Sequence, residues 1–295
     1  MPTLLDFRRR IRSVKNTQQI TRAMKFVAAA RLRRAQEAAL AARPYAKELA
    51  RLLRSIMSRI DEPKHPLLAK RAEERILTIV LTGERGLAGA FNSNILRKAN
   101  EFFRDHKGKQ LSVLPVGKKG RDSLKKAGFT LVAEYVNVLA RVDFRTAREI
   151  STLVTDLYME DKIDSVYIIF SEFKTVMTPH LVVEKLLPVE GLREDEESKN
   201  KSPDQQESTQ VDYIYEQPPE QILGKLLPRY IETQVLRAML ESSAAEHAAR
   251  MTAMESATKN AGDVIEALTL HMNKVRQAAI TKEIIEIVSG ASYNA

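Results

Sequence analysis

The stretch TRAMKFVAAARLRRAQEAALAARPYAKELARLLRSI, residues 21–56, decides the first element of the fold. It belongs to a longer segment, Leu4 to Ile60, that has no glycine and a single proline, Pro44, and that is rich in strong helix formers. Its apolar residues recur mostly three or four positions apart, which places them on one stripe of a helix. The stripe comprises Ile11, Val14, Met24, Val27, Ala28, Leu32, Ala35, Ala39, Ala42, Ala46, Leu49, Leu53, Ile56 and Ile60. The pattern predicts a helix of about 57 residues, which would extend roughly 85 Å.

The last segment, from Pro219 to about Ser289, has the same character. It contains two glycines, Gly224 and Gly262, and one further proline, Pro228, near its start. Its apolar stripe comprises Ile231, Val235, Met239, Ala244, Met251, Met254, Ala257, Ala261, Val264, Ile265, Leu268, Met272, Val275, Ala279, Ile284 and Val288. A helix of about 70 residues would extend roughly 105 Å, and it cannot bury such a stripe alone. We therefore expect a coiled coil.

Two such stripes at opposite ends of one chain, separated by a compact insert, favour an antiparallel pair within the chain. The many alanines in both stripes indicate a close approach of the helices. A homodimeric coiled coil stays open as an alternative.

Between the two long helices, short strands alternate with helices. The apolar runs at 75–82, 110–117, 130–136 and 165–173 predict strands, and 180–189 predicts a further edge strand. Helical segments are expected between them, at 92–106, 118–127 and 144–161. This alternation predicts a Rossmann-like, mostly parallel α/β domain inserted between the helices of a long antiparallel coiled coil.

The domain organisation follows from these elements. We expect residues 1–62 and 218–295 to form the two helices of the coiled coil and residues 70–217 to form the α/β domain. Residues 190–210 are polar, charged and almost free of large apolar groups, so they are predicted to be a mobile surface loop.

Charge is distributed unevenly along the 295 residues. The first 60 residues hold 15 Lys and Arg against three Asp and Glu, whereas the remaining chain is slightly acidic. Such a basic segment favours an acidic partner surface, nucleic acid or an anionic membrane. The chain has no cysteine, which excludes disulfides, thiolate nucleophiles and cysteine-ligated metal sites. No apolar run is long enough to predict a membrane span or a secretory signal.

Two glycine-containing turns are the strongest candidates for a ligand-binding site. The segment TGERGLAGAFN, residues 82–92, follows the first predicted strand, where backbone N–H groups could bind a phosphate, but it fits neither a P-loop nor the G-x-G-x-x-G spacing. The turn GKKG, 117–120, resembles the clamp of a KH domain. A tight strand-to-helix turn explains both. We expect no catalytic residue, cofactor site or metal site.

Longer motifs at both ends resemble a known family. SVKNTQQITRAMKFVAAARL (13–32), with RPYAKEL (43–49), is similar to the N-terminal helix of the gamma subunit of F-type ATP synthases, and RQAAITKEIIEIVSGAS (276–292) resembles the C-terminal motif of that family. RGLAGAFN (85–92), LPRYIETQV (227–235) and AARMTAMESATKNAG (248–262) agree in the same order. Ala88 stands where the family usually has cysteine, and Tyr293 where it has a small or basic residue.

The resemblance implies a central-stalk subunit of a bacterial F-type ATP synthase, which couples ion-driven rotation of the membrane c ring to conformational cycling of the catalytic beta subunits. It implies alpha, beta and epsilon subunits and the c ring as partners and one copy per complex. Catalysis would belong to the beta subunits. It further implies a peripheral location at the cytoplasmic face of the inner membrane, with membrane association only through the complex.

The resemblance also implies residues that contact the ring of alpha and beta subunits. Two lie on the first helix, four form polar contacts on the last helix, and the rest form its apolar end. These residues are Met24, Lys25, Arg276, Gln277, Thr281, Glu283, Ile287, Val288 and Ala291.

Two alternatives from other classes of protein stay open. The Arg-rich first helix is compatible with a helical nucleic-acid-binding protein, although aromatic residues are sparse there. An α/β enzyme with helical arms would need a nucleotide or phosphate at the turn between Gly83 and Gly89.

Overall fold

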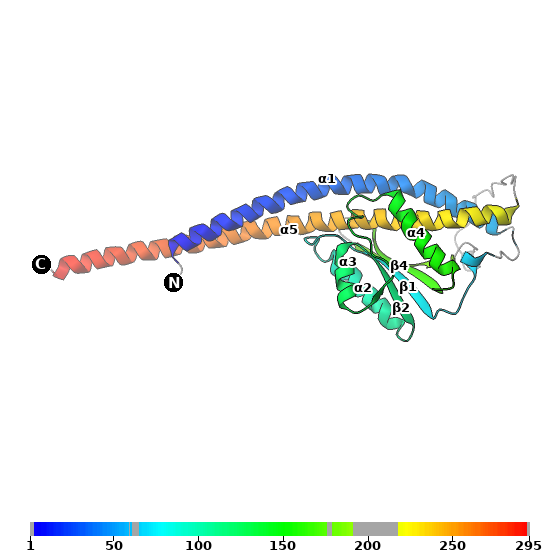
Figure 1. Ribbon diagram of the computed structural model, residues 1–295. Helices are drawn as coiled ribbons and strands as arrows, with labels where there is room; N and C mark the ends of the chain where they lie inside the picture. Colours follow the sequence, from blue (N-terminus) through cyan, green and yellow to red (C-terminus); the bar gives the residue numbers. More distant parts are fainter. Residues whose placement is uncertain (1–2, 59, 61–64, 176–178, 191–217, 294–295) are drawn as a thin grey trace, which may run out of the picture. The chain divides into compact units, whose positions relative to one another are not determined.

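The computed structural model describes residues 3–58, 60, 65–175, 179–190 and 218–293 (Figure 1). Its contacts divide the chain into two compact units. Unit 1 combines residues 1–29 with 250–295, and unit 2 comprises residues 30–249. The division into segments 1–62, 70–217 and 218–295 stays a prediction, and the predicted mobile loop lies, from residue 191 onward, outside the described residues.

Two long helices contribute to both units. Helix α1 extends over Leu4–Met57 and α5 over Pro219–Tyr293. The start of α1 is capped by Thr3 and Asp6: the Asp6 N–H is bonded to Thr3 Oγ1 at 3.3 Å, and the Thr3 N–H donates to Asp6 Oδ2 at 2.9 Å. This reciprocal arrangement satisfies N–H groups that have no partner inside the helix. Helix α5 begins with Pro219, whose missing N–H costs nothing in the first turn.

Unit 2 contains a five-stranded sheet of order β3-β2-β1-β4-β5. The strands are β1 (Arg75–Leu81), β2 (Gln110–Val116), β3 (Thr130–Leu131), β4 (Ser165–Phe173) and β5 (Pro179–Leu187). The first four pair in parallel, and β5 pairs with β4 antiparallel at the edge. The mostly parallel sheet predicted from the alternating pattern is confirmed.

Helices cover both faces of this sheet (Figure 1). Leu77, Ile79 and Leu81 of β1 pack in a core with α4 (Phe144–Met159) and with the unit 2 parts of α1 and α5. The alternate residues Ile76 and Val80 pack against α2 (Phe91–Asp105) and α3 (Lys118–Lys126). Because successive strand residues face opposite sides, an uninterrupted apolar strand requires cover on both.

Strand β3 is much shorter than the predicted strand over 130–136, which was wrong beyond Leu131. Pro115 of β2 explains the difference. Its C=O accepts a hydrogen bond from Tyr135 N at 3.1 Å, so this position of β2 faces the β3 side, where proline has no N–H to donate. The ladder therefore breaks at that position, and only an isolated bridge between Val116 and Tyr135 follows.

Some positions of the predicted helical stripes were also wrong. Val27 is 53% exposed and Val264 is 45% exposed, whereas Ala28 is buried. A narrow helix–helix contact admits one of two successive residues, because they lie about 100° apart around the helix axis. The small Ala28 permits the closer approach.

Candidate partner-contact surface

The two helices of unit 1 run antiparallel and are joined by polar bonds. Lys25 Nζ donates to Glu255 Oε1 at 2.6 Å, and Thr258 Oγ1 donates to Thr21 Oγ1 at 2.8 Å. Further along, the Phe7 ring lies beside His271, with ring centroids 5.0 Å apart. Rising numbers on α1 therefore meet falling numbers on α5, which confirms the predicted antiparallel coiled coil.

The first pair of predicted contact residues lies on α1 within unit 1. Met24 and Lys25 are both half-buried. The ammonium group of Lys25 is engaged by Glu255, so a partner's carboxylate would have to share it or replace Glu255. Neighbouring Phe26 is 62% exposed and lines a groove of about 700 Å³ with Arg22.

Sequence reasoning missed Phe26 because it looked for apolar residues inside the helical stripe. An apolar aromatic residue outside the stripe is itself a signal, since it predicts exposure on a paired helix. Val27, placed in the stripe by its spacing, joins Phe26 on the exposed surface.

The four predicted polar contact residues on α5 are all exposed. Gln277 and Thr281 are four residues apart and share one helix face, while Arg276 and Glu283 are seven apart and share another. Thr281 Oγ1 donates to the Gln277 backbone oxygen at 2.9 Å, so its proton is used inside the helix and its lone pairs face outward. The Gln277 amide can both donate to and accept from a partner.

The apolar end of α5 is exposed as well. Within unit 1, α5 continues to Tyr293, well past the contact between His271 and Phe7 at the start of α1 (Figure 1). Ile287 and Val288 are 71% and 59% exposed, and Ile284 and Ile285 exceed 50%. A run of large exposed aliphatic residues marks an interaction surface rather than scattered surface variation. Ala291 lies in α5, beyond the residues whose side chains are described.

In unit 2, the carboxyl edge of the parallel sheet faces α5. This edge is where open α/β sheets commonly bind ligands. A Cβ on Gly83, which follows β1, would lie only 2.8 Å from Glu246 Oε1. Ser243 Oγ donates to the Leu139 carbonyl at 3.1 Å. A carboxylate therefore occupies the space next to the turn after β1, where a phosphate would be repelled, and the phosphate hypothesis finds no support in this geometry.

The second glycine turn is explained by packing. Gly117 has φ of +108°, and a Cβ there would lie 1.9 Å from the Thr82 carbonyl oxygen. The Gly120 N–H donates to Thr82 Oγ1 at 2.7 Å. Both glycines thus let α3 start directly against the end of β1.

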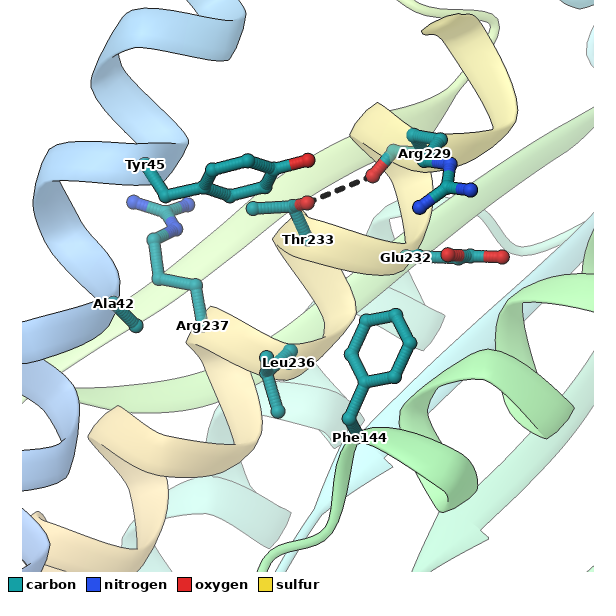
Figure 2. Close-up of a pocket in the computed structure, with 8 residues that line it drawn as sticks. All are labelled: Ala42, Tyr45, Phe144, Arg229, Glu232, Thr233, Leu236 and Arg237. Carbon is teal, nitrogen blue, oxygen red and sulfur yellow. Dashed lines mark hydrogen bonds between the residues drawn. The ribbon is translucent and has the colours of Figure 1, made fainter. Parts of the chain in front are cut away.

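A cavity of about 350 Å³ lies between α1, α5 and the start of α4 (Figure 2). Tyr45 and Phe144 contribute aromatic rings, and Arg229 and Arg237 contribute guanidinium groups. The Thr233 hydroxyl on the floor donates to the Arg229 carbonyl at 2.7 Å and is committed to the helix. The residues that line the cavity include no nucleophile paired with a base. The cavity could therefore bind a small chemical group, but its lining has no evident catalytic residues.

Two sets of ion pairs lie at the opposite edge of the sheet, one around Asp164 and one around Lys185. Hydrogen bonds from Arg75 lower the pKa of the Asp164 carboxyl, against the effect of its burial. Burial alone would lower the pKa of Lys185, but hydrogen bonds to Glu73 and Glu190 outweigh it and raise that pKa to about 12. Asp164 and Lys185 therefore stay charged at neutral pH.

The described part of the chain holds neither a cluster of metal ligands nor a helix able to span a membrane. There, no three His, Asp or Glu side chains gather where a metal ion could bind. In the same ranges, none of the helices is long and apolar enough to cross a bilayer.

The sequence of this chain is similar to those of known proteins over nearly its whole length. A family model described as ATP synthase matches residues 3–293. The ATP synthase gamma chain of Solibacter usitatus is 48% identical over 296 residues, covering 99% of both chains. The ATP synthase gamma chain of Pelotomaculum thermopropionicum is 45% identical over 292 residues, again covering 99% of each.

Solved structures agree in fold. A chain from the Euglena gracilis mitochondrial ATP synthase, OSCP/F1/c-ring in rotational state 3, matches with a TM-score of 0.66 at 20% identity, covering 98% of this chain and 93% of that one. A chain from the Tetrahymena thermophila mitochondrial ATP synthase central stalk and c ring matches with a TM-score of 0.59 at 24% identity, covering 81% and 99%. None of these findings supports the nucleic-acid alternative.

Proposed function

The chain belongs to the ATP synthase gamma chain family, and from that premise we propose that it is the rotating shaft of a bacterial F-type ATP synthase. It is a central-stalk subunit that couples ion-driven rotation of a membrane c ring to the conformational cycle of catalytic beta subunits. The observation that carries the proposal is the relationship to gamma chains over 99% of the sequence. The exposed apolar end of α5 supports it, because a shaft tip must present such a surface to a collar.

Rotation would be coupled to the nucleotide sites because the shaft contacts each beta subunit differently. A shaft that is not symmetric presents a different face to each beta subunit as it turns, and each nucleotide site is biased toward the conformation that fits that face. Met24 and Lys25 would meet acidic loops of beta, and Arg276, Gln277, Thr281 and Glu283 would make polar contacts with loops of the ring. Ile287, Val288 and Ala291 would turn within an apolar collar.

The same proposal assigns no catalytic step to this chain. The carboxylate of Glu246 beside Gly83 supports this, since it stands where a phosphate-binding turn would need a cation or bare N–H groups. Alpha, beta and epsilon subunits and the c ring are the proposed partners, with one copy of this chain per complex. Its membrane association would be only through the complex, at the cytoplasmic face of the inner membrane.

Reconstitution tests the role directly. The purified chain should hydrolyse no ATP alone and should complete an active, rotating complex when mixed with alpha and beta subunits. Native mass spectrometry of that complex should find one copy among several alpha and beta chains. ATP hydrolysis by the chain unaided, or failure to join the ring, would contradict the proposal.

The contact residues are tested by a double variant, Gln277→Ala with Thr281→Ala. Both side chains are exposed, so we expect assembly or coupled rotation to suffer while the isolated chain unfolds at an unchanged temperature. Thr269→Ala is a matched control, because Thr269 makes the same bond to a carbonyl four residues earlier, that of Ile265 at 2.7 Å, outside the proposed contact set. Wild-type ATP synthesis by the double variant in vesicles would argue against these contacts.

A further inference from the structure

A buried carboxylate in unit 2 has no part in the proposed contacts. The side chain of Glu241 on α5 is only 5% exposed. Burying a charged carboxylate is costly unless it is paired and hydrogen-bonded. Here Arg43 donates to Oε1 from Nε at 3.1 Å and from Nη2 at 2.8 Å, and the Phe173 backbone N–H donates to Oε2 at 3.1 Å.

The three groups come from three different elements. Arg43 belongs to α1, Glu241 to α5, and Phe173 is the last residue of β4. Arg43 Nη2 also lies 3.4 Å from the Phe173 carbonyl oxygen, to which it donates. Both polar groups of one peptide residue are thus tied to the two long helices. We refer to these three residues as the Arg43–Glu241–Phe173 clamp.

The clamp differs in kind from the apolar core beside it. Leu49 and Leu53 of α1 and Val235 and Met239 of α5 are buried in the shared apolar core. Apolar contacts are not directional, so they constrain the register of two helices only through the shape of the packed side chains. Two N–H groups of Arg43 converge on one oxygen of the Glu241 carboxylate, and such a charge-assisted, directional contact favours one register.

Helix α1 is also locally weakened at this position. Pro44, directly after Arg43, has no N–H to donate to the carbonyl four residues earlier, and proline inside a helix is a common cause of bending. The clamp therefore binds α1 at the turn where the helix bends most readily.

We propose that the Arg43–Glu241–Phe173 clamp fixes the register of α1 against α5 and the sheet, so that torque on the α/β domain passes into the helix pair without slippage. Arg43 and Glu241 are then positioning residues for coupling, since they contact neither nucleotide nor transported ion. The inference rests on the proposed shaft function. A merely structural role predicts a different result: loss of stability with the coupling of surviving complexes intact.

The test uses the complete complex carrying Glu241→Gln, which keeps the shape of the side chain but removes its charge. Because the chain has no cysteine, Ser123→Cys on the exposed face of α3 provides a single attachment point for a rotational probe. With the ring immobilised, the angular variance of the probe should rise at least about two-fold, and ions pumped per ATP should fall, while ATP hydrolysis persists. Glu37→Gln is the matched control, because it breaks an exposed pair with Arg33 within α1.

Arg43→Lys provides a second, milder variant. Lysine keeps the charge but cannot make the two-pronged contact, so its angular variance should fall between those of the wild type and Glu241→Gln. If Glu241→Gln fails to assemble, Arg43→Lys carries the same test. The proposed role of the clamp would be overturned if a clamp variant assembled and had the same angular variance and the same number of ions pumped per ATP as the wild type. A wild-type chain that never joins the ring would instead refute the shaft function itself.

Discussion

Two stretches of helix α5 carry aliphatic residues at helical spacing but have opposite surroundings. Ile231 and Val235 in unit 2 are buried, whereas Ile287 and Val288 in unit 1 are 71% and 59% exposed. The first stretch packs in a core with the sheet, α4 and α1. The second continues beyond the start of α1. An apolar stripe thus predicts that a helix will be covered, but the cover can belong to the same chain or to a partner.

The largest expected effect tests the buried stretch. Ile231→Ala should destabilise the isolated chain by about 2–5 kcal/mol, because it leaves a cavity in a close-packed core. Urea unfolding followed by circular dichroism measures this difference. A cost below about 1 kcal/mol, the central value for point mutations in general, would mean that the core of unit 2 is looser than its burial indicates.

A smaller effect concerns the polar anchor of the same core. Asp164→Asn should cost about 1–3 kcal/mol at pH 7, since Arg75 loses its charged partner. The pKa of Asp164 is lowered in the folded state, so the stability it contributes is present above its unfolded pKa of about 3.9 and is lost as pH falls toward the folded value.

Thermal unfolding between about pH 6 and 2.5 checks this sign. The variant should lose less stability on acidification than the wild type does. Glu37→Gln, at an exposed pair, should leave the pH dependence nearly unchanged. Parallel curves for Asp164→Asn and the wild type would contradict the assignment.

Lys25→Glu tests the polar join of unit 1 and should have a smaller effect on folding. The Lys25–Glu255 pair is partly exposed, so losing it and placing two carboxylates together should cost about 1 kcal/mol or less in the isolated chain. In the complex the same change should lower the ions pumped per ATP, because it reverses the charge that is proposed to face acidic loops of beta. If the further substitution Glu255→Lys in the Lys25→Glu variant restored pumping, the effect would come from the internal Lys25–Glu255 pair and not from a contact with beta.

The smallest effect on folding is expected at the exposed stretch. Ile287→Ala should change the stability of the isolated chain by less than about 0.5 kcal/mol, because the side chain is already in water. Its effect should appear only in the complex, as weaker assembly. Pull-down with alpha and beta subunits, beside unfolding of the free chain, separates the two. A large loss of stability in the free chain would erase the contrast with Ile231.

Much of the fold could be predicted from local pattern. Helical spacing placed α1 and α5 nearly to their ends, and alternating elements predicted the parallel sheet with an edge strand after β4. The length of β3 could not be predicted, because the effect of Pro115 depends on which neighbour its missing N–H would face. Val27 and Ala28 fit the same stripe, and only the paired helix selects between them.

Of the candidate surface, Ile287 and Val288 were predicted from the family resemblance as contact residues. Their exposure within this chain required the structure, since helical spacing alone would equally suit a buried seam. The partner of Lys25 and the buried Glu241 were likewise invisible in the sequence. Arg43 and Glu241 are 198 positions apart. No local pattern relates them, because their meeting depends on how two helices and a strand pack.

The sequence by itself determined the two long apolar stripes, the inserted α/β pattern and the family motifs, because each rests on residues near one another in the chain. Tertiary structure alone decided which stretch of α5 is covered, where Arg43 of α1 meets Glu241, and that α5 fills the space beside Gly83. Those outcomes depend on directional bonds and steric fit between distant segments, which local periodicity does not contain.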